Sequence, residues 1–175
     1  GNDVQLPGLL HGAILRSPHA HARILSIDTS AAEAIPGVRA VATAADLPDL
    51  KDKWTNLGEI AINLAHLGGN CLAKGKVLYK GHAVAAVAAA SAHEAHEARK
   101  AIVVEYEPLP HVTWVLDAMQ EDAPLLHEDV FTDSMGEFSE EPSNVSRYLL
   151  LEQGEPDHAF DECDLVIERE YRTAS

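Results

Sequence analysis

Residues 77–110 read VLYKGHAVAAVAAASAHEAHEARKAIVVEYEPLP, which is the densest run of small apolar residues in the chain. Within it, residues 83–90 form a continuous apolar segment short enough for one buried strand, and Gly81 marks the point where that strand begins. The segment therefore predicts a buried strand around which the rest of the chain is organised.

A helix is predicted directly after this strand. Ser91 and Glu94 form a capping box, in which each side chain accepts from a backbone N–H that the first helical turn leaves unpaired. The following residues separate into a small apolar face and a charged face: Ala92, Ala95, Ala98 and Ala101 or Ile102 against Glu94, Glu97 and Lys100. The β-branched residues 102–104 predict a second strand, which Pro108 and Pro110 end. The stretch therefore predicts a small layer of helix on sheet.

The flanking segments predict further short elements. Strands are expected over residues 13–15, 22–27, 38–42, 60–64 and 165–171, and short helices over 31–34, near 43–46, near 115–119 and from Pro156, with Ala159 and Phe160 facing inward. Residues 68–70, Gly-Gly-Asn, are expected to form a loop. Residues 121–146 are rich in acids, Pro, Gly and Ser with little periodicity, which predicts a long connector.

Residues 10–24, LHGAILRSPHAHARI, and residues 35–38, IPGV, join the stretch 77–110 in a resemblance to a known family. The chain resembles the molybdenum-cofactor-binding large subunit of the xanthine dehydrogenase and aldehyde oxidase family, and within it the N-terminal α/β hammerhead domain. The resemblance covers most of residues 6–120 and resumes over 154–173. At residues 80–83 the family usually has an acid or Gln followed by Pro, so His82 is a departure from its pattern.

The resemblance implies an α+β fold, a hammerhead-like mixed sheet with helices packed on one side. It also implies a division into a hammerhead core over residues 1–120 and an acidic connector over 121–153. Residues 154–175 would then form a helix and strand that complete the domain or lead into absent molybdenum-cofactor domains. Because no initiator Met precedes the family pattern, the chain is expected to be an excised piece of a longer protein.

For the parent enzyme, the resemblance implies oxidative hydroxylation of a purine, aldehyde or N-heteroaromatic with oxygen drawn from water. Molybdopterin would be held by C-terminal domains of the same chain, with 2Fe–2S and FAD in partner domains or subunits, and a homodimer remains open. The residues that act on the cofactor lie in those C-terminal domains. We therefore expect this chain to be inactive alone, to act as a scaffold and contact surface, and to supply no catalytic, cofactor-binding or metal-ligating residue.

The net charge of −15 is concentrated in the last third of the chain. Residues 1–116 have a net charge of −1 and residues 117–175 a net charge of −14. This distribution argues against binding to nucleic acid or anionic lipid. No apolar run long enough for a membrane span and no signal peptide is found, which favours the cytoplasm. Cys71 and Cys163 follow no metal-binding spacing, and two reduced thiols are favoured over a disulfide.

Two histidine pairs are candidate metal ligands. His19 and His21 would share one face of a strand, but no further ligand lies at a matching spacing, so packing or surface roles are favoured. His93 and His96 lie three residues apart on the predicted helix, and a solvated polar face is favoured for them.

The remaining polar candidates have structural explanations as well. Ser17, Ser91 and Ser134 lack the setting of a nucleophile, and Ser91 is explained as a cap. Two pairs of acids could act in acid–base catalysis: Glu105 with Glu107, and Glu140 with Glu141. No apolar segment encloses either pair, so nothing would raise the pKa of these carboxyl groups. Arg16 is equally consistent with a domain contact and with a structural salt bridge. The Gly68-Gly69 pair lacks a phosphate-loop motif.

Two other classes of function remain as alternatives. An acidic interaction module over residues 117–150 would bind a basic protein in a salt-sensitive way through Glu137, Glu140 and Glu141. A metal hydrolase using His19 and His21 would bind zinc stoichiometrically and lose it when either histidine is replaced.

Overall fold

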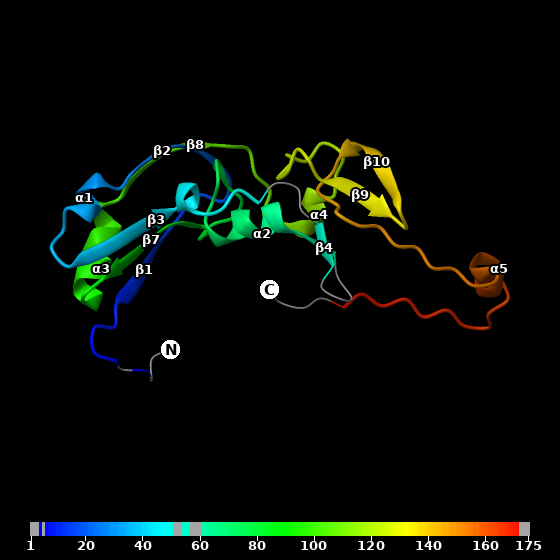
Figure 1. The fold of residues 1–175 in the computed structure, drawn as a ribbon. Helices are drawn as coiled ribbons and strands as arrows, with labels where there is room; N and C mark the ends of the chain where they lie inside the picture. The colour runs from blue at the N-terminus through cyan, green and yellow to red at the C-terminus, as the bar shows by residue number, and fades with distance from the viewer. Residues whose placement is uncertain (1–3, 5, 51–53, 57–60, 172–175) are drawn as a thin grey trace. The chain divides into compact units, whose positions relative to one another are not determined.

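The computed structural model describes residues 4, 6–50, 54–56 and 61–171. The chain divides into two compact units, Gly1–Leu126 and His127–Ser175, which we call the first and second units and describe separately (Figure 1). The domain boundaries predicted after residues 120 and 153 refer to the domains of a longer protein, and they stay predictions. In the described part of the chain, no helix is long and apolar enough to span a bilayer.

The first unit is built on a three-stranded sheet whose centre is the strand predicted from residues 83–90. The strands are β1 (His11–Arg16), β3 (Val38–Thr43) and β7 (Ala83–Ala89), in the order β1-β7-β3. Both pairings are antiparallel, and Val87 faces Ala13 on one side and Val41 on the other. The three predicted strands are therefore confirmed.

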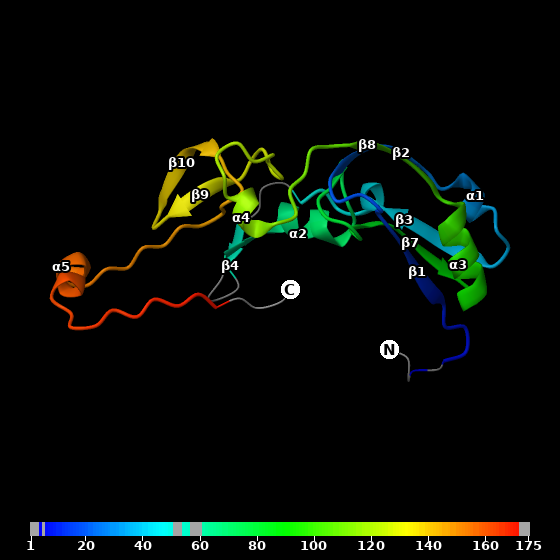
Figure 2. The same cartoon turned by 180° about the vertical axis from the view of Figure 1, so that it is seen from behind.

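Helices α1 (Ser30–Glu33) and α3 (Ala92–Ala101) cover one face of this sheet, as Figures 1 and 2 show. The core between them consists mostly of small side chains: Ala32, Ala85, Val87, Ala98 and Ile102. Alanine at these positions lets the helix axis approach the sheet closely. The prediction of helices on one side of the sheet is confirmed.

Ser91 is the N-cap of α3, as predicted. Its Oγ accepts from the Glu94 backbone N–H at 3.2 Å. The reciprocal half of the box differs from the expectation, because the Ser91 hydroxyl donates to the Glu94 carboxylate at 2.9 Å. The serine hydroxyl therefore both caps the helix and fixes the glutamate side chain.

A second three-stranded sheet has the order β6-β2-β8, with β2 (Ala22–Asp28), β6 (Lys76–Val77) and β8 (Val103–Pro108). Its core contains Ala22, Ala73, Val77 and Val84. These pairings are antiparallel too. The prediction of an α+β hammerhead fold is confirmed. The described strands of this unit form separate antiparallel sheets, however, so the predicted single mixed sheet differs in this detail.

Short elements complete the first unit: the 3₁₀ helix η1 (Ala44–Asp46), β4 (Trp54–Asn56), β5 (Ala61–Asn63), α2 (Leu64–Cys71) and α4 (Val115–Ala118). The strand expected over 60–64 is shorter, because the Asn63 side chain accepts from the Ala65 N–H at 2.9 Å and starts α2. Residue 60 lies outside the described residues. The loop expected at residues 68–70 is wrong, since α2 continues through both glycines.

The second unit contains a β-hairpin where a connector without regular structure was expected. Strands β9 (Phe131–Ser134) and β10 (Glu137–Pro142) pair antiparallel across Met135 and Gly136, both of which have positive φ. Two consecutive residues in this conformation are typical of hairpin turns that match the strand twist. The Gly136 N–H donates to the Asp133 carboxylate at 2.8 Å, and this bond together with Arg147 lowers the pKa of Asp133.

The rest of the second unit departs from two expectations. Helix α5 (Pro156–Asp161) is confirmed, with Pro156 in its first turn, but Phe160 is 61% exposed rather than facing inward. Residues 165–171 form no strand. A strand needs a neighbour to accept its hydrogen bonds, and the described part of this unit pairs none with that segment.

Candidate functional site

The loop between β1 and β2 gathers several of the polar residues singled out from the sequence. Ser17 is buried, and its Oγ accepts from the His19 N–H at 3.0 Å. The His19 ring lies edge-on to Tyr106 of β8, with the ring centroids 5.0 Å apart. Burial raises the pKa of Tyr106, and a hydrogen bond with Ser17 opposes part of that change. This serine is a structural link between two strands.

His21 joins this loop to the segment that follows β8. Its Nδ1 lies 2.9 Å from the Pro110 carbonyl oxygen, which can only accept, so Nδ1 carries the proton. Its Nε2 is then an acceptor, and it is the buried side-chain atom without a partner among the described residues. Neither His19 nor His21 belongs to a cluster of three potential metal ligands within the described ranges. The geometry gives no support to a hydrolytic metal centre.

His82 is completely buried at the entry to β7. Its Nδ1 accepts from the Leu78 N–H at 3.1 Å, and its Nε2–H donates to the Gly69 carbonyl at 2.9 Å. The ring stacks on Tyr79 with centroids 4.5 Å apart. Burial lowers the pKa of His82, which therefore stays neutral, tying helix α2 to the strand entry.

Arg16 takes part in the same corner of the fold. Its Nη1 donates to the Gly81 carbonyl at 2.8 Å, so its described partner is a backbone group and not the acid that the salt-bridge alternative required. The Ser17 N–H donates to the His82 carbonyl, and the Gly81 N–H donates to the Ser17 carbonyl, both at 2.9 Å. Arg16 therefore braces the turn that carries His82.

The other polar candidates lie at the surface with local partners. On α3, His93 and His96 are exposed, and the Nε2 of His96 accepts from Arg99 at 3.2 Å. On the second sheet, the Ser26 hydroxyl donates to Glu105 and Arg23 pairs with Glu107. Glu140 and Glu141 of β10 are exposed, and Ser134 of β9 is half-buried. Cys71 and Cys163 are exposed free thiols.

The first unit has an open groove of about 560 Å³ beside β2, η1 and residues 73–75. Its charged residues already have partners within the unit. Glu33 accepts from the Thr29 hydroxyl at 2.7 Å, Asp46 accepts from the Thr43 N–H at 2.8 Å, and Lys74 pairs with Asp49 at 2.9 Å. The groove therefore presents no converging set of polar groups for a small ligand.

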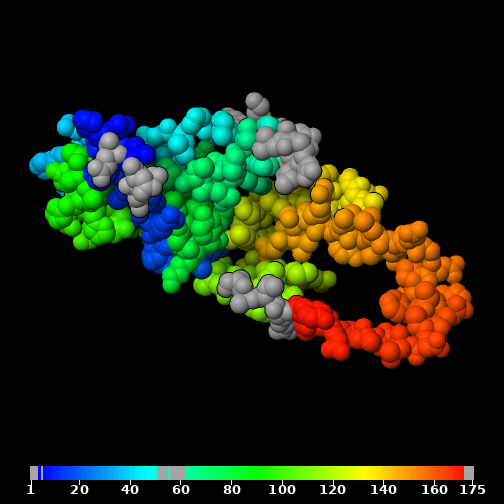
Figure 3. All heavy atoms as spheres, turned by 90° about the horizontal axis from the view of Figure 1, so that it is seen from below, coloured from blue at the N-terminus to red at the C-terminus, as the bar shows by residue number. Residues whose placement is uncertain are grey.

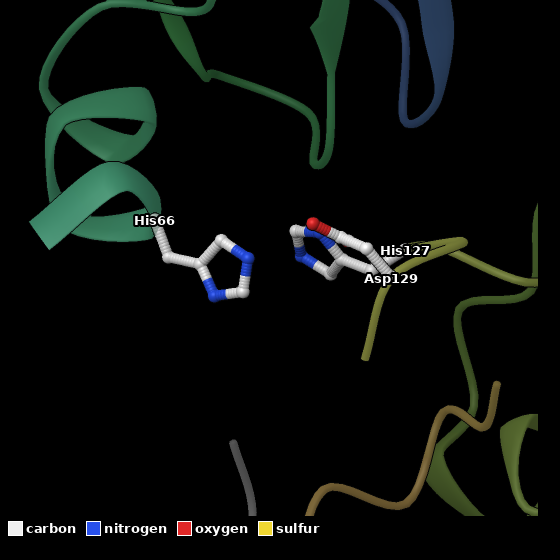
Figure 4. Close-up of side chains that lie close together, drawn as sticks. All are labelled: His66, His127 and Asp129. Carbon is white, nitrogen blue, oxygen red and sulfur yellow. The ribbon is translucent and has the colours of Figure 1, made fainter. Parts of the chain in front are cut away.

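Figure 4 shows the side chains of His66, His127 and Asp129. His66 lies on α2 of the first unit, whereas His127 and Asp129 begin the second unit. The three side chains therefore belong to two units that are described separately. We assign no site to these residues, and the absence of a metal site from the chain stays a prediction.

The amino-acid sequence matches a family model described as "Aldehyde oxidase and xanthine dehydrogenase, a/b hammerhead domain" over residues 1–110. The carbon monoxide dehydrogenase large chain of Afipia carboxidovorans is 39% identical over 169 residues, covering 94% of this chain and 20% of the relative. The nicotinate dehydrogenase large molybdopterin subunit of Eubacterium barkeri is 34% identical, covering 98% of this chain and 35% of the relative.

Solved structures give the same result. A structure of reconstituted CO dehydrogenase from Oligotropha carboxidovorans superposes with a TM-score of 0.59 and 46% identity, covering 71% of this chain and 15% of that one. Quinoline 2-oxidoreductase from Pseudomonas putida 86 superposes with a TM-score of 0.58 and 40% identity, covering 70% of this chain and 15% of that one. The chain thus spans about a fifth of the length of the first curated relative it matches.

Proposed function

The chain belongs to the aldehyde oxidase and xanthine dehydrogenase family, and on this premise we propose that it is the hammerhead scaffold of a molybdenum hydroxylase large subunit. Its role is to brace the domains that hold the cofactor and to offer contact surface to them and to the electron-transfer partners. The observation that carries this proposal is the match to the hammerhead model over residues 1–110.

The contacts of the candidate residues support a structural role. Ser17, Ser91 and Arg16 are engaged in caps and turns, and the ring nitrogens of His82 are both hydrogen-bonded to backbone groups. In each case the hydrogen bond holds a helix cap, a turn or a strand entry in place. We therefore propose that this chain contributes no catalytic residue.

The proposed reaction of the whole protein is oxidative hydroxylation of a small substrate with oxygen from water, in the cytoplasm. Purines, aldehydes and N-heteroaromatics are the substrate classes that we propose first. Two relatives are named for carbon monoxide and one for nicotinate, so carbon monoxide and a pyridine carboxylate belong in the same assay panel.

We propose that molybdopterin is bound outside these 175 residues, and that 2Fe–2S and FAD belong to partner domains or subunits. A pterin dinucleotide needs many polar groups facing one cavity. Within the described ranges, a single buried side-chain atom, Nε2 of His21, lacks a partner, and the charged rim of the groove is already paired. These residues do not fit the cofactor.

The test compares this chain with a longer chain that continues to the length of the relatives. Molybdenum and pterin content are measured in both, and oxidation of xanthine, an aldehyde, nicotinate and carbon monoxide is assayed in parallel. We expect cofactor and turnover in the longer chain alone. Molybdenum or turnover in the 175-residue chain would overturn the scaffold proposal.

The contact role has its own measurement. The 175-residue chain is mixed with the remainder of the large subunit, and the mixture is examined by analytical ultracentrifugation. We expect a complex that sediments faster than either component. Two independent boundaries would remove the support for a bracing role.

A further inference from the structure

The second unit exposes a row of large apolar side chains on a segment that belongs to no sheet. Residues 165–171, LVIEREY, form neither helix nor strand, although their composition predicts a strand. Leu165 is 74% exposed, Ile167 66% and Tyr171 85%. Figure 3 shows the segment as red spheres that form a thin extended chain. Contiguous exposed apolar groups of this kind mark interaction surfaces.

The order of side chains along the segment gives it two different faces. In an extended chain successive side chains point to opposite sides. Leu165, Ile167, Arg169 and Tyr171 then share one side, while Val166, Glu168 and Glu170 share the other. The first side is mostly apolar and the second side carries both acids, a division typical of a strand in a sheet that has one face on a core and the other in water. The segment therefore has the pattern of a strand that needs both a neighbouring strand and a core.

The comparisons indicate where that neighbour lies. Sequence alignments with two relatives cover 94% and 98% of this chain, whereas the solved structures superpose on 70 to 77% of it. The alignment that covers 98% of this chain leaves out only about 2% of it, so it includes at least part of residues 165–171. The first curated relative is also about five times as long as the match, which covers 20% of it. A segment shared with much longer relatives is consistent with one that the rest of the large chain orders.

We infer that residues 165–171 form a β-strand by adding to a sheet edge supplied by the part of the large chain outside these 175 residues. Leu165 and Ile167 face the core of that sheet, Arg169 and Tyr171 follow on the same side toward the end of the strand, and Glu168 faces water. Backbone hydrogen bonds to the edge strand supply the affinity, and the alternating apolar side chains set the register. This inference rests on the proposed function and names the segment that makes one of its contacts.

Hydrogen exchange of the backbone amides tests the inference in the 175-residue chain and in the longer large subunit. We expect amides of residues 165–171 to exchange about 100-fold more slowly in the longer chain. The peptide over β7 serves as a folding control, because it should be equally protected in both. Equal exchange of residues 165–171 in the two chains would overturn the inference. Protection that appears in the 175-residue chain as its concentration rises would assign the segment to a second copy and overturn it too.

Two substitutions in the longer chain separate the two faces. We expect Ile167→Ser to remove the protection of residues 165–171, and Glu168→Ser, next to it on the opposite face, to retain it. Equal effects of the two substitutions would overturn the assigned register. Molybdenum content is measured on the same wild-type sample. A molybdenum-loaded longer chain with unprotected residues 165–171 overturns the strand alone, whereas a longer chain without molybdenum contradicts the proposed function.

Discussion

Gly37 lies in the turn between α1 and β3 with a φ of +91°, and the Glu94 carboxylate fills the space that a Cβ would need. L side chains rarely adopt this backbone conformation. We expect Gly37→Ala to lower the free energy of unfolding by about 1–3 kcal/mol, because it strains the turn and displaces Glu94 from Ser91. Urea denaturation measures the loss.

Gly75→Ala is the matched control for this substitution. Gly75 also has a positive φ, of +78°, but nothing lies within 4 Å of the position of its Cβ. Its replacement should therefore cost only the backbone strain of about 1 kcal/mol. Equal losses for the two variants would show that the position of Glu94 contributes nothing to stability.

His82 should make the stability of the first unit depend on pH. Its folded pKa is lowered by burial, so the unfolded chain binds a proton that the folded chain excludes. The contribution of this residue to stability is therefore complete above 6.5, the usual pKa of histidine, and is lost as pH falls below that value, with a slope of at most about 1.4 kcal/mol per pH unit. Urea denaturation between pH 5 and pH 8, a range of about three units around the pKa of histidine, measures this slope.

The control for this prediction is His82→Gln, which keeps a donor and an acceptor but does not titrate. We expect the variant to be less stable at neutral pH and to have a shallower slope below the pKa of free histidine. The same slope in both proteins would mean that other histidines cause the acid sensitivity.

At the scale of single elements, the small side chains of α3 set how closely the helix packs on the sheet. Ala98 is completely buried against Ala32 and Ala85, whereas Ala92 is exposed on the same helix. We expect Ala98→Leu to cost about 1–3 kcal/mol through overpacking, and Ala92→Leu to change stability by less than about 0.5 kcal/mol. Thermal and urea unfolding of both variants measure the difference, and similar values would contradict a close-packed α3.

Elements with short-range signals were predicted from the sequence. The cap at Ser91, the apolar run of β7 and the proline that starts α5 each act within a few residues. Helix α2 was missed where Gly68 and Gly69 indicated a loop, because the Gly69 carbonyl is held by His82, which lies far along the chain. Tertiary contacts of this kind override local propensity and leave no local sequence signal.

Among the candidate site residues, too, only roles that depend on nearby residues were predictable from the sequence. Ser91 was correctly explained as a cap, because capping depends on Glu94 alone. The roles of Arg16 and His82 were not predictable, since their partners are backbone carbonyls that only the folded chain brings near. The hairpin of the second unit was missed for a related reason. Its turn, Met135-Gly136, lacks the Asn or Asp that usually announces a hairpin.

At the scale of the whole molecule, the described hydrophobic cores are built from residues of the first unit, while most of the negative charge lies beyond Asp117. A unit with its own core can fold alone. We therefore expect the chain ended after Leu126 to unfold at a urea concentration no lower than that of the whole chain. Both tryptophans, Trp54 and Trp114, belong to the first unit, so fluorescence follows that unit in either protein.

The shorter chain has a net charge of −4 in place of −15, so self-repulsion should be weaker in it. Adding salt at about 0.5 M, which screens such repulsion, should consequently raise the unfolding midpoint of the whole chain by at least as much as that of the shorter one. A loss of more than about 1 kcal/mol on truncation would show that the first unit depends on residues 127–175 for its stability. An unchanged midpoint would instead show that the hammerhead part of the chain is stable without the segment that carries residues 165–171.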